Sequence, residues 1–195
     1  PVNAPYSLLN GSLILDSSHH VLHCAGMPED TKDLIRMTLS EFSQIGCEIF
    51  VGNRVLIRRM SPETEHHIKV LDLEYSMVTQ ESLGNTAEWC KINFTGKPEQ
   101  MENVRTFLKP YTDRFCMASS MPAFCEITAS RINKGSALKQ IAADCGIAEN
   151  RIFAIGDSYN DEAMLQAAHI GFAPSNSDED ILRTADVVVC SNNED

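Results

Sequence analysis

Two aspartates, Asp157 and Asp161, are the residues of this sequence whose type and spacing best suit chemistry. They follow the apolar run 152–155 and Gly156, and an apolar, Ala-rich pattern typical of a helix comes directly after them. In open α/β sheets, ligands bind where strands end beside the starts of helices. Two carboxylates this close repel each other unless a cation lies between them, and Mg²⁺ accepts one or two carboxylates while keeping its waters. The alternative that spacing alone leaves open is a pair of acids that caps the helix.

A lysine, Lys134, lies just before a helix that the pattern predicts to start near Ser136. The dipole at a helix N-terminus favours anions, so a cation there is unfavourable unless an anion is bound close to it. Phosphate binds well at helix N-termini because the first backbone N–H groups are unpaired. The alternative is a solvated lysine in a turn.

The last third of the chain alternates predicted helices with short apolar strands. We expect helices at 136–145, 161–168 and 180–184, the last capped by Ser177, and strands at 152–155, 170–173 and 187–190. This alternation is typical of a parallel, doubly wound sheet. The acids and the lysine would be positioned by this sheet.

Residues from about 20 to 122 show a different pattern, in which paired strands alternate with helices. We expect helices at 28–45, 62–70 and 98–108, and strands at 47–51, 54–58, 89–94, 114–118 and 123–127. Two-residue turn signals, Gly52-Asn53 and, earlier in the chain, Asn10-Gly11, each predict a hairpin. Residues 72–87 show no clear pattern. The hairpins indicate a mostly antiparallel sheet with helices on one face, an α+β layer.

Composition limits the class of protein. The chain has 195 residues, 43% of them hydrophobic, enough for one large domain or two small ones. The net charge of −11 argues against nonspecific binding of nucleic acid or anionic membranes. No run approaches the roughly 18 apolar residues of a membrane helix, and no secretory signal opens the chain. We therefore expect no nucleic-acid partner, no membrane and a cytoplasmic location. Because the chain opens at Pro1 rather than Met, we also expect a missing upstream segment.

Seven cysteines and a histidine cluster are the other reactive groups. The odd cysteine number, without any C-x-x-C, favours buried free thiols in a reducing compartment over a disulfide framework or a zinc site. The histidines at 19, 20 and 23 beside Cys24 are zinc-ligand types, but their spacing fits no standard finger. A solvated strand or turn is the better interpretation of that cluster.

The lysine and the acids together carry a family resemblance. The runs N-K-G-S-A-L at 133–138 and G-D-S-Y-N-D-E-A-M-L at 156–165 resemble motifs III and IV of the haloacid dehalogenase superfamily, in its Cof-type branch with a class IIB cap. The segment 6–16 resembles the N-G hairpin that leads from core to cap in that branch, and 124–127 resembles its return segment. The resemblance implies a Rossmann-like α/β core, present in part and parallel, at 1–16 and 123–195. An α+β cap would be inserted at 17–122.

The resemblance also implies roles for site residues. Asp157 would bind Mg²⁺ directly, and Asp161 would support the metal through water or through other residues. Lys134 would neutralise charge between an attacking carboxylate and the phosphate, and Asn160 would hydrogen-bond the phosphoryl group or the nucleophile. Asn10 joins Lys134 and Asn160 in the implied phosphate-binding set. The cap would close over the site and select the substrate through its loops, with 72–90 as the candidate segment.

The sequence departs from the family in lacking the D-x-D motif, which ends the first core strand and supplies the nucleophile. Asp16, Asp72 and Ser119-Ser120 follow strands or turns but fit it poorly. We expect this chain to be a cap with the C-terminal half of a core, completed by a missing N-terminal segment or a second chain. By itself it would not turn over substrate.

The function this implies is a Mg²⁺-dependent phosphatase that hydrolyses small phosphomonoesters, such as sugar phosphates, through an aspartyl-phosphate intermediate. Its partner would be a small phosphorylated metabolite. Two alternatives remain open. One is a catalytically silent module that binds a phosphorylated ligand or a protein, and the other is a phosphomutase that uses the same aspartyl-phosphate chemistry.

Overall fold

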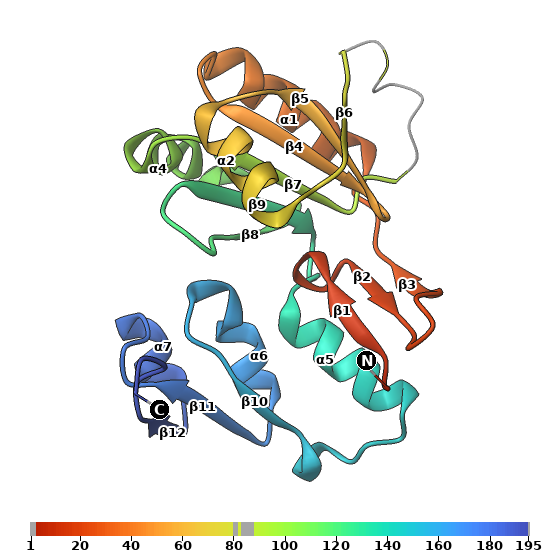
Figure 1. Cartoon of the computed structure of the whole chain (residues 1–195), viewed down its shortest axis with the longest axis vertical. Helices are drawn as coiled ribbons and strands as arrows, with labels where there is room; N and C mark the ends of the chain where they lie inside the picture. The colour runs from red at the N-terminus through yellow and green to blue at the C-terminus, as the bar shows by residue number, and fades with distance from the viewer. Residues whose placement is uncertain (1–2, 80–81, 83–87, 195) are drawn as a thin grey trace. The chain divides into compact units, whose positions relative to one another are not determined.

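The computed structural model describes residues 3–79, 82 and 88–194 (Figure 1). The chain divides into two compact units, a terminal unit made of Pro1–His23 and Ile132–Asp195, and a central unit, Cys24–Arg131. These boundaries differ from the 16/17 and 122/123 division that we expected from the sequence. The first differs because β3 (Val21–Cys24) joins the sheet of β2 (Leu13–Leu15), and the second because β9 (Phe124–Ala129) pairs inside the central sheet.

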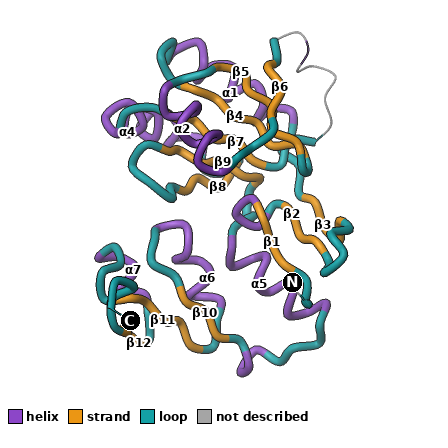
Figure 2. The backbone as a smooth tube through the Cα atoms, viewed as in Figure 1, coloured by secondary structure: helices purple, strands orange, loops and turns teal. Residues whose placement is uncertain are grey.

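A six-stranded sheet in the order β6-β5-β4-β7-β9-β8 forms the framework of the central unit (Figure 2). Its remaining strands are β4 (Gly46–Val51), β5 (Arg54–Arg59), β6 (Tyr75–Met77), β7 (Lys91–Thr95) and β8 (Phe115–Ala118). All neighbouring pairs are antiparallel except β5 and β6, which are parallel. Strand β6 falls in the segment 72–87, for which no clear pattern was found, and residues 80–81 and 83–87 of that segment lie outside the described residues.

The hairpin at Gly52-Asn53 is confirmed, since Val51 pairs with Arg54 across a two-residue connection and Gly52 has φ +57°. At Asn10-Gly11 the hairpin is also present, but its connection is longer. Leu8 pairs with Leu13, and the 3₁₀ turn η1 (Leu9–Gly11) lies between β1 (Tyr6–Leu8) and β2. The prediction of a two-residue turn there was wrong because Leu9 as well as Asn10 and Gly11 takes a positive φ.

The apolar core of the central unit lies between the sheet and two helices, α1 (Glu29–Glu41) and α4 (Pro98–Leu108). Helix α1 ends at Glu41, four residues before the predicted end, because Phe42 already has an extended ψ of 90°. The short 3₁₀ turn η2 (Lys109–Tyr111) follows α4. The core includes Leu34, Ile35, Ile49, Trp89, Ile92, Phe94, Met101 and Val104. Strand residues alternate between faces, so every second residue of β4 and β7 contributes to this core.

The third helix, α2 (Pro62–Leu71), lies against the opposite face of the same sheet, so helices contact both faces and not one as expected. On that face Glu48 is fully buried, and both of its carboxylate oxygens lie within 3.0 Å of Nδ1 of His67 from α2. Asn93 donates its side-chain N–H to Glu48 at 2.8 Å. Next to them Lys91 and Glu126 form a buried ion pair at 3.2 Å. This face is therefore held by paired polar groups, as burial of charge requires.

The terminal unit contains two separate three-stranded sheets, β1-β2-β3 and β10-β11-β12 (Figure 1). The second sheet, made of β10 (Phe153–Ile155), β11 (Ile170–Pro174) and β12 (Val187–Val189), is parallel, as the alternating pattern predicted. Helices α6 (Glu162–Ala167) and α7 (Glu179–Thr184) connect its strands, and α5 (Lys134–Asp144) packs against α6. The 3₁₀ turns η3 (Glu149–Arg151) and η4 (Tyr159–Asp161) flank β10.

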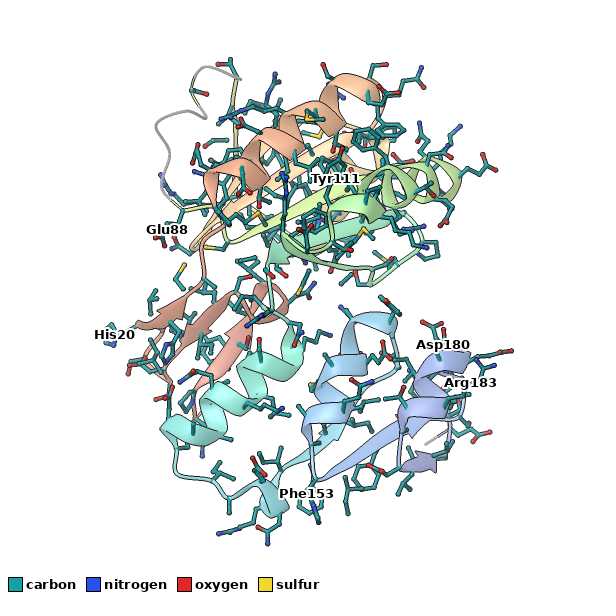
Figure 3. All side chains as sticks on the ribbon, turned by 180° about the vertical axis from the view of Figure 1, so that it is seen from behind. His20, Glu88, Tyr111, Phe153, Asp180 and Arg183 are labelled. Atoms are coloured by element: carbon teal, nitrogen blue, oxygen red, sulfur yellow. The ribbon has the colours of Figure 1, made fainter. Side chains whose placement is uncertain are left out.

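The parallel sheet is covered on one face only within the described part of the chain. Ala154 and Ala173 are buried against Leu165 of α6 and Ile181 of α7. The opposite face is open: Phe153, labelled in Figure 3, is 59% exposed and Ile155 is 60% exposed. The expected double winding, with helices on both faces, is therefore not seen among the residues that the structure describes.

The prediction that Ser177 caps a helix was wrong, whereas the histidines at 19, 20 and 23 are exposed to solvent as predicted. Ser177 does not cap α7, because Asp178 is the residue before its first turn and the Ser177 hydroxyl donates to the carbonyl of Pro174 instead. His20 lies in an exposed turn between β2 and β3, where its backbone N–H, with that of Ser18, holds the pKa of Asp16 below its usual value. Among the helices of the described residues, none is long and apolar enough to cross a bilayer.

Candidate active site

Helix α5 begins at Lys134, two residues earlier than the sequence pattern suggested. The side chain of Asn133 accepts a hydrogen bond from the backbone N–H of Ser136 at 2.9 Å, and the Ser136 hydroxyl lies 3.0 Å from the N–H of Asn133. This reciprocal arrangement is a capping box, and it satisfies two groups that the helix leaves unpaired. The lysine is thereby fixed in the first helical turn, so its side chain leaves the helix in a defined direction.

Lys134 and Asp161 are joined directly, although 26 residues separate them in the sequence. The lysine Nζ lies 2.5 Å from Oδ1 of Asp161, whose residue is only 5% exposed. The other oxygen, Oδ2, accepts the backbone N–H groups of Asp157 and Ser158, each at 3.3 Å. Asp161 therefore positions two things at once, the lysine and the loop that carries Asp157.

Two glycines allow the chain segments of the site to approach closely. A Cβ added at Gly156 would lie 2.4 Å from Cβ of Asp161, and one added at Gly135 would lie 2.1 Å from the carbonyl oxygen of Ala163 in α6. Both distances are far below van der Waals contact. Glycine at these positions lets the end of β10 and the start of α5 approach η4 and α6.

Asp157 is the acid of the site that faces solvent. Its Oδ1 accepts the hydroxyl of Ser158 at 3.2 Å, and its backbone carbonyl accepts the N–H of Asp178 at 3.2 Å. The second contact ties the end of β10 to the start of α7. The carboxylate is thus held at the carboxyl end of a parallel strand, where such sheets bind ligands.

Asn160 contributes a polar atom that the described residues leave unsatisfied. Its Oδ1 is buried and has no hydrogen-bond partner among the residues that the structure describes. A buried amide oxygen without a donor is unusual, because most buried polar atoms are paired. It is available as an acceptor for a hydrogen-bond donor at this corner of the molecule.

Asn10 and Lys134 both line a cavity of about 420 Å³ in the terminal unit. Its walls come from η1 and the strand before it, from α5 and from Met164 of α6. The turn can lie against α5 because Gly11 has no side chain, and a Cβ there would lie 2.3 Å from the carbonyl oxygen of Asn133. Apart from Asn10 and Lys134 the lining is mostly apolar: Ser7, Leu8, Leu9, Gly11, Leu138, Ile141 and Met164.

Few side chains near Asp157 and Asp161 could bind a metal ion. The described residues contain no group of three or more His, Cys, Asp and Glu side chains arranged to hold a metal ion. Mg²⁺, however, needs only one or two protein carboxylates and takes water or phosphate oxygens for the rest. With both oxygens of Asp161 engaged by Lys134 and backbone amides, Asp157 is the carboxylate that fits a direct magnesium contact.

Comparison with known proteins decides the family. The family model of haloacid dehalogenase-like hydrolases matches residues 1–195. The chain belongs to this family. Its members with solved structures include the subclass IIB sugar phosphatase BT4131, whose fold superposes with a TM-score of 0.81 at 20% identity, over 97% of this chain and 71% of that one.

Curated relatives match this chain over different lengths. YxeH of Bacillus subtilis (strain 168) is 36% identical over 105 residues, which are 53% of this chain and 39% of YxeH. The 5-amino-6-(5-phospho-D-ribitylamino)uracil phosphatase YcsE of the same organism is 26% identical over 199 residues, covering 94% of this chain and 78% of YcsE. The chain thus spans well under half of one relative and about three quarters of the other.

Family membership confirms the resemblance that the motifs at 133–138 and 156–165 indicated, and the structure confirms the mixed α/β fold class. The structure brings Lys134, Asp157 and Asp161 together, buries Oδ1 of Asn160 in the adjoining turn η4, and places Asn10 on a cavity shared with Lys134. Sequence reasoning missed the part played by Ser158, which contacts Asp157, and by the capping pair Asn133 and Ser136. The N-x-x-S spacing was the signal that could have shown the cap.

Proposed function

We propose that this hydrolase acts on small phosphomonoesters, such as sugar phosphates, in a Mg²⁺-dependent reaction that passes through an aspartyl-phosphate. The observation that carries the proposal is the Lys134–Asp161 pair, held beside Asp157 at the carboxyl end of β10. A cation and a metal-binding carboxylate at one strand end suit phosphoryl transfer, which is mostly positioning and charge stabilisation. The relatives named as phosphatases support the same reaction class.

Each site residue has a role in this proposal. Asp157 would hold Mg²⁺, which would offset the negative charge that develops on the phosphoryl oxygens. Lys134 places a positive charge between the attacking carboxylate and the phosphate. Asn160 hydrogen-bonds the phosphoryl group or the nucleophile, and Asn10 contributes to phosphate binding from η1. Asp161 fixes the positions of Lys134 and the Asp157 loop, because one of its oxygens contacts the lysine Nζ and the other accepts the backbone N–H of Asp157.

The attacking aspartate is not found in these residues, and we propose that a further strand ending in D-x-D supplies it. That strand is either part of the same polypeptide or part of a second chain. The open edge of the parallel sheet supports this: β10 pairs only with β11 within the described residues, and Phe153 and Ile155 on it are more than half exposed. A strand with unpaired N–H and C=O groups and an apolar face is a template for another strand.

The central unit would serve as the cap that excludes water and selects the leaving group. The proposed partner is a small phosphorylated metabolite, and the proposed location is the cytoplasm, where a reducing environment suits seven free thiols.

Phosphate release from a panel of sugar phosphates tests the proposal. We expect none from the 195-residue chain alone. Intact-mass measurement of the native protein should show a longer polypeptide, and that protein should release phosphate with Mg²⁺ but not after chelation. The variants Asp157→Asn and Lys134→Met should each lower its kcat at least a hundredfold, about 3 kcal/mol. Glu162→Gln, which also lies beside the loop, is the matched control and should leave kcat within twofold.

The absent nucleophile favours one alternative, a silent module that binds phosphorylated ligands. In that case the native protein carries no strand ending in D-x-D, and it binds phosphate or a sugar phosphate in calorimetry without hydrolysing it. Hydrolysis by the 195-residue chain itself would contradict both the phosphatase proposal and the silent-module alternative, because it would require a nucleophile among these residues. Transfer of phosphate to a second sugar rather than to water would identify the phosphomutase alternative.

A further inference from the structure

Two cysteine sulfurs in the central unit lie almost within bonding distance of each other. The Sγ atoms of Cys24 and Cys90 are 3.1 Å apart, although the residues are 66 positions apart in the sequence. Both are free thiols in this structure. A disulfide bond is about 2.05 Å long, so the two sulfurs need to approach by only about 1 Å.

The backbone fixes this approach independently of the sulfurs. The N–H of Met27 donates to the carbonyl of Trp89 at 2.8 Å, and the N–H of Cys90 donates to the carbonyl of Phe50 at 2.8 Å. Gly26 lies so close to Glu88 that an added Cβ would be 2.7 Å from the Cβ of the glutamate. Glu88 is labelled in Figure 3. The segments around Cys24 and Cys90 therefore run side by side whether or not the thiols react.

The two thiols also differ in a way that suits stepwise reaction. Cys24 is exposed, whereas Cys90 is fully buried and accepts the backbone N–H of Gly52 at 3.5 Å. A reagent in solution therefore reaches Cys24 first, and Cys90 is already placed to attack Cys24 afterwards. An exposed cysteine with a second cysteine beside it has the geometry of a reactive and a resolving thiol. Because partial burial and the neighbouring Cys90 raise the pKa of Cys24, its thiolate forms mainly at alkaline pH, where this reaction is fastest.

We propose that Cys24 and Cys90 are a reversible oxidation site, which a small-molecule disulfide such as glutathione disulfide converts to a protein disulfide. The Cys24 thiolate attacks one sulfur of the reagent, breaks its S–S bond and releases one thiol. The Cys90 thiolate then attacks Cys24 in the mixed disulfide and releases the second thiol. The protein gives up two electrons and two protons, and the two released thiols take them up.

The disulfide would tie the last residue of β3 to the residue before β7, inside the central unit. It closes a long loop of chain, which restricts the unfolded state and raises the melting temperature. This site uses none of the residues placed in the proposed active site, so it stands or falls separately from the proposed phosphatase function.

The test is oxidation of the 195-residue chain with glutathione disulfide at alkaline pH, where more of Cys24 is thiolate, followed by peptide mapping without reduction. The variant Cys145→Ser is the matched control, because Cys145 is also exposed but lies on the other unit. We expect a peptide pair that joins Cys24 to Cys90, a mass loss of about 2 Da for that pair, and full reversal by dithiothreitol. The control variant should form the same pair, with a melting temperature several degrees above that of its reduced form.

The variant Cys90→Ser provides the second measurement, since it leaves Cys24 without its resolving thiol. It should retain glutathione on Cys24, an adduct of about 305 Da, where the wild-type chain does not. Equal retention of glutathione on Cys24 in both chains would overturn the proposal, as would a map in which Cys24 pairs with another cysteine. If Cys90→Ser fails to fold, the wild-type map decides by itself.

Discussion

The Nζ atom of Lys134 lies 2.5 Å from Oδ1 of Asp161, and through this contact the first turn of α5 is fixed to η4. The same aspartate accepts the backbone N–H groups of Asp157 and Ser158 with its other oxygen. One nearly buried carboxylate thus holds the candidate lysine and the candidate metal-binding loop in a single arrangement. Whatever this corner binds, the two charged groups that would contact the ligand are positioned before it arrives.

Replacing the lysine should destabilise the chain. In Lys134→Met the Asp161 carboxylate stays buried but loses its only cationic partner among the described residues, so we expect unfolding free energy to fall by about 1–3 kcal/mol. Urea denaturation measures the change. Lys139→Met, on the exposed side of the same helix, should change stability by less than about 0.5 kcal/mol. Equal stability of the two variants would mean that the pair contributes nothing to folding.

Gly135→Ala separates helix propensity from packing. Propensity alone predicts stabilisation by up to about 1 kcal/mol, because alanine is the better helix former. The added Cβ would lie 2.1 Å from the Ala163 carbonyl oxygen, a backbone atom that no rotamer change can move, so we expect a loss of about 1–3 kcal/mol instead. Thermal unfolding gives the sign. At Gly146 nothing lies within 4 Å of an added Cβ, so Gly146→Ala should show only the cost of a positive φ.

Glu48, a fully buried carboxylate of the central unit, should be sensitive to substitution. Glu48→Ala removes the acceptor of His67 and Asn93 and leaves a cavity, so we expect a loss of about 2–4 kcal/mol. Glu65→Ala, on the exposed side of α2, should be nearly neutral. Chemical denaturation of both variants is the measurement, and a neutral Glu48→Ala would show that the network is not needed for stability.

Magnesium binding, which rests on the proposed function, should depend on Asp157 more than on Asp161. We expect Asp157→Asn to weaken Mg²⁺ affinity about 10–100-fold in a titration followed by the amide resonance of Gly156. The solvent-facing carboxylate is the one left for a cation, since both oxygens of Asp161 are engaged. A larger effect from Glu162→Gln would place the cation elsewhere.

The reactivity of Cys24 should rise steeply with pH. Partial burial first, and then the thiol of Cys90 and the charge of Glu88, raise the pKa of Cys24 to about 12. The thiolate fraction therefore grows about tenfold per pH unit from pH 7 to pH 10, and alkylation by iodoacetamide should follow it. Cys90→Ala removes one of these causes, which lowers the pKa and speeds alkylation of Cys24 at pH 8. A rate that does not depend on pH would contradict the raised pKa.

The thiols also show where local sequence context misleads. Cys47, Cys90 and Cys125 are buried as predicted, and burial raises the pKa of Cys47 and of Cys125 to about 12. Cys24, Cys145 and Cys190 are exposed, although apolar residues surround some of them in the sequence. An apolar neighbour indicates burial only if the strand or helix has a partner on that face, and strand β3 is exposed at all four residues.

Much of the candidate site follows from the sequence alone. The acids at the end of an apolar strand, the lysine at a helix start and the glycines between them are local signals, because strand ends, helix caps and tight approaches each depend on a few adjacent residues. The parallel pairing of β10, β11 and β12 followed from the alternation of elements in the same way. These local features carry the resemblance to the haloacid dehalogenase-like hydrolases, and the match of the family model to residues 1–195 confirms it.

The tertiary structure decided what each charge does. By type and spacing alone Asp157 and Asp161 are equivalent, and only the family resemblance gave them different roles. Folding buries Asp161 against a lysine and two backbone amides and leaves Asp157 facing solvent. The domain boundaries, the placement of α2 on the second face of the sheet and the contact of Cys24 with Cys90 also depend on partners far away in the chain. Local patterns specify elements, whereas burial and pairing of distant side chains are set only when those elements pack.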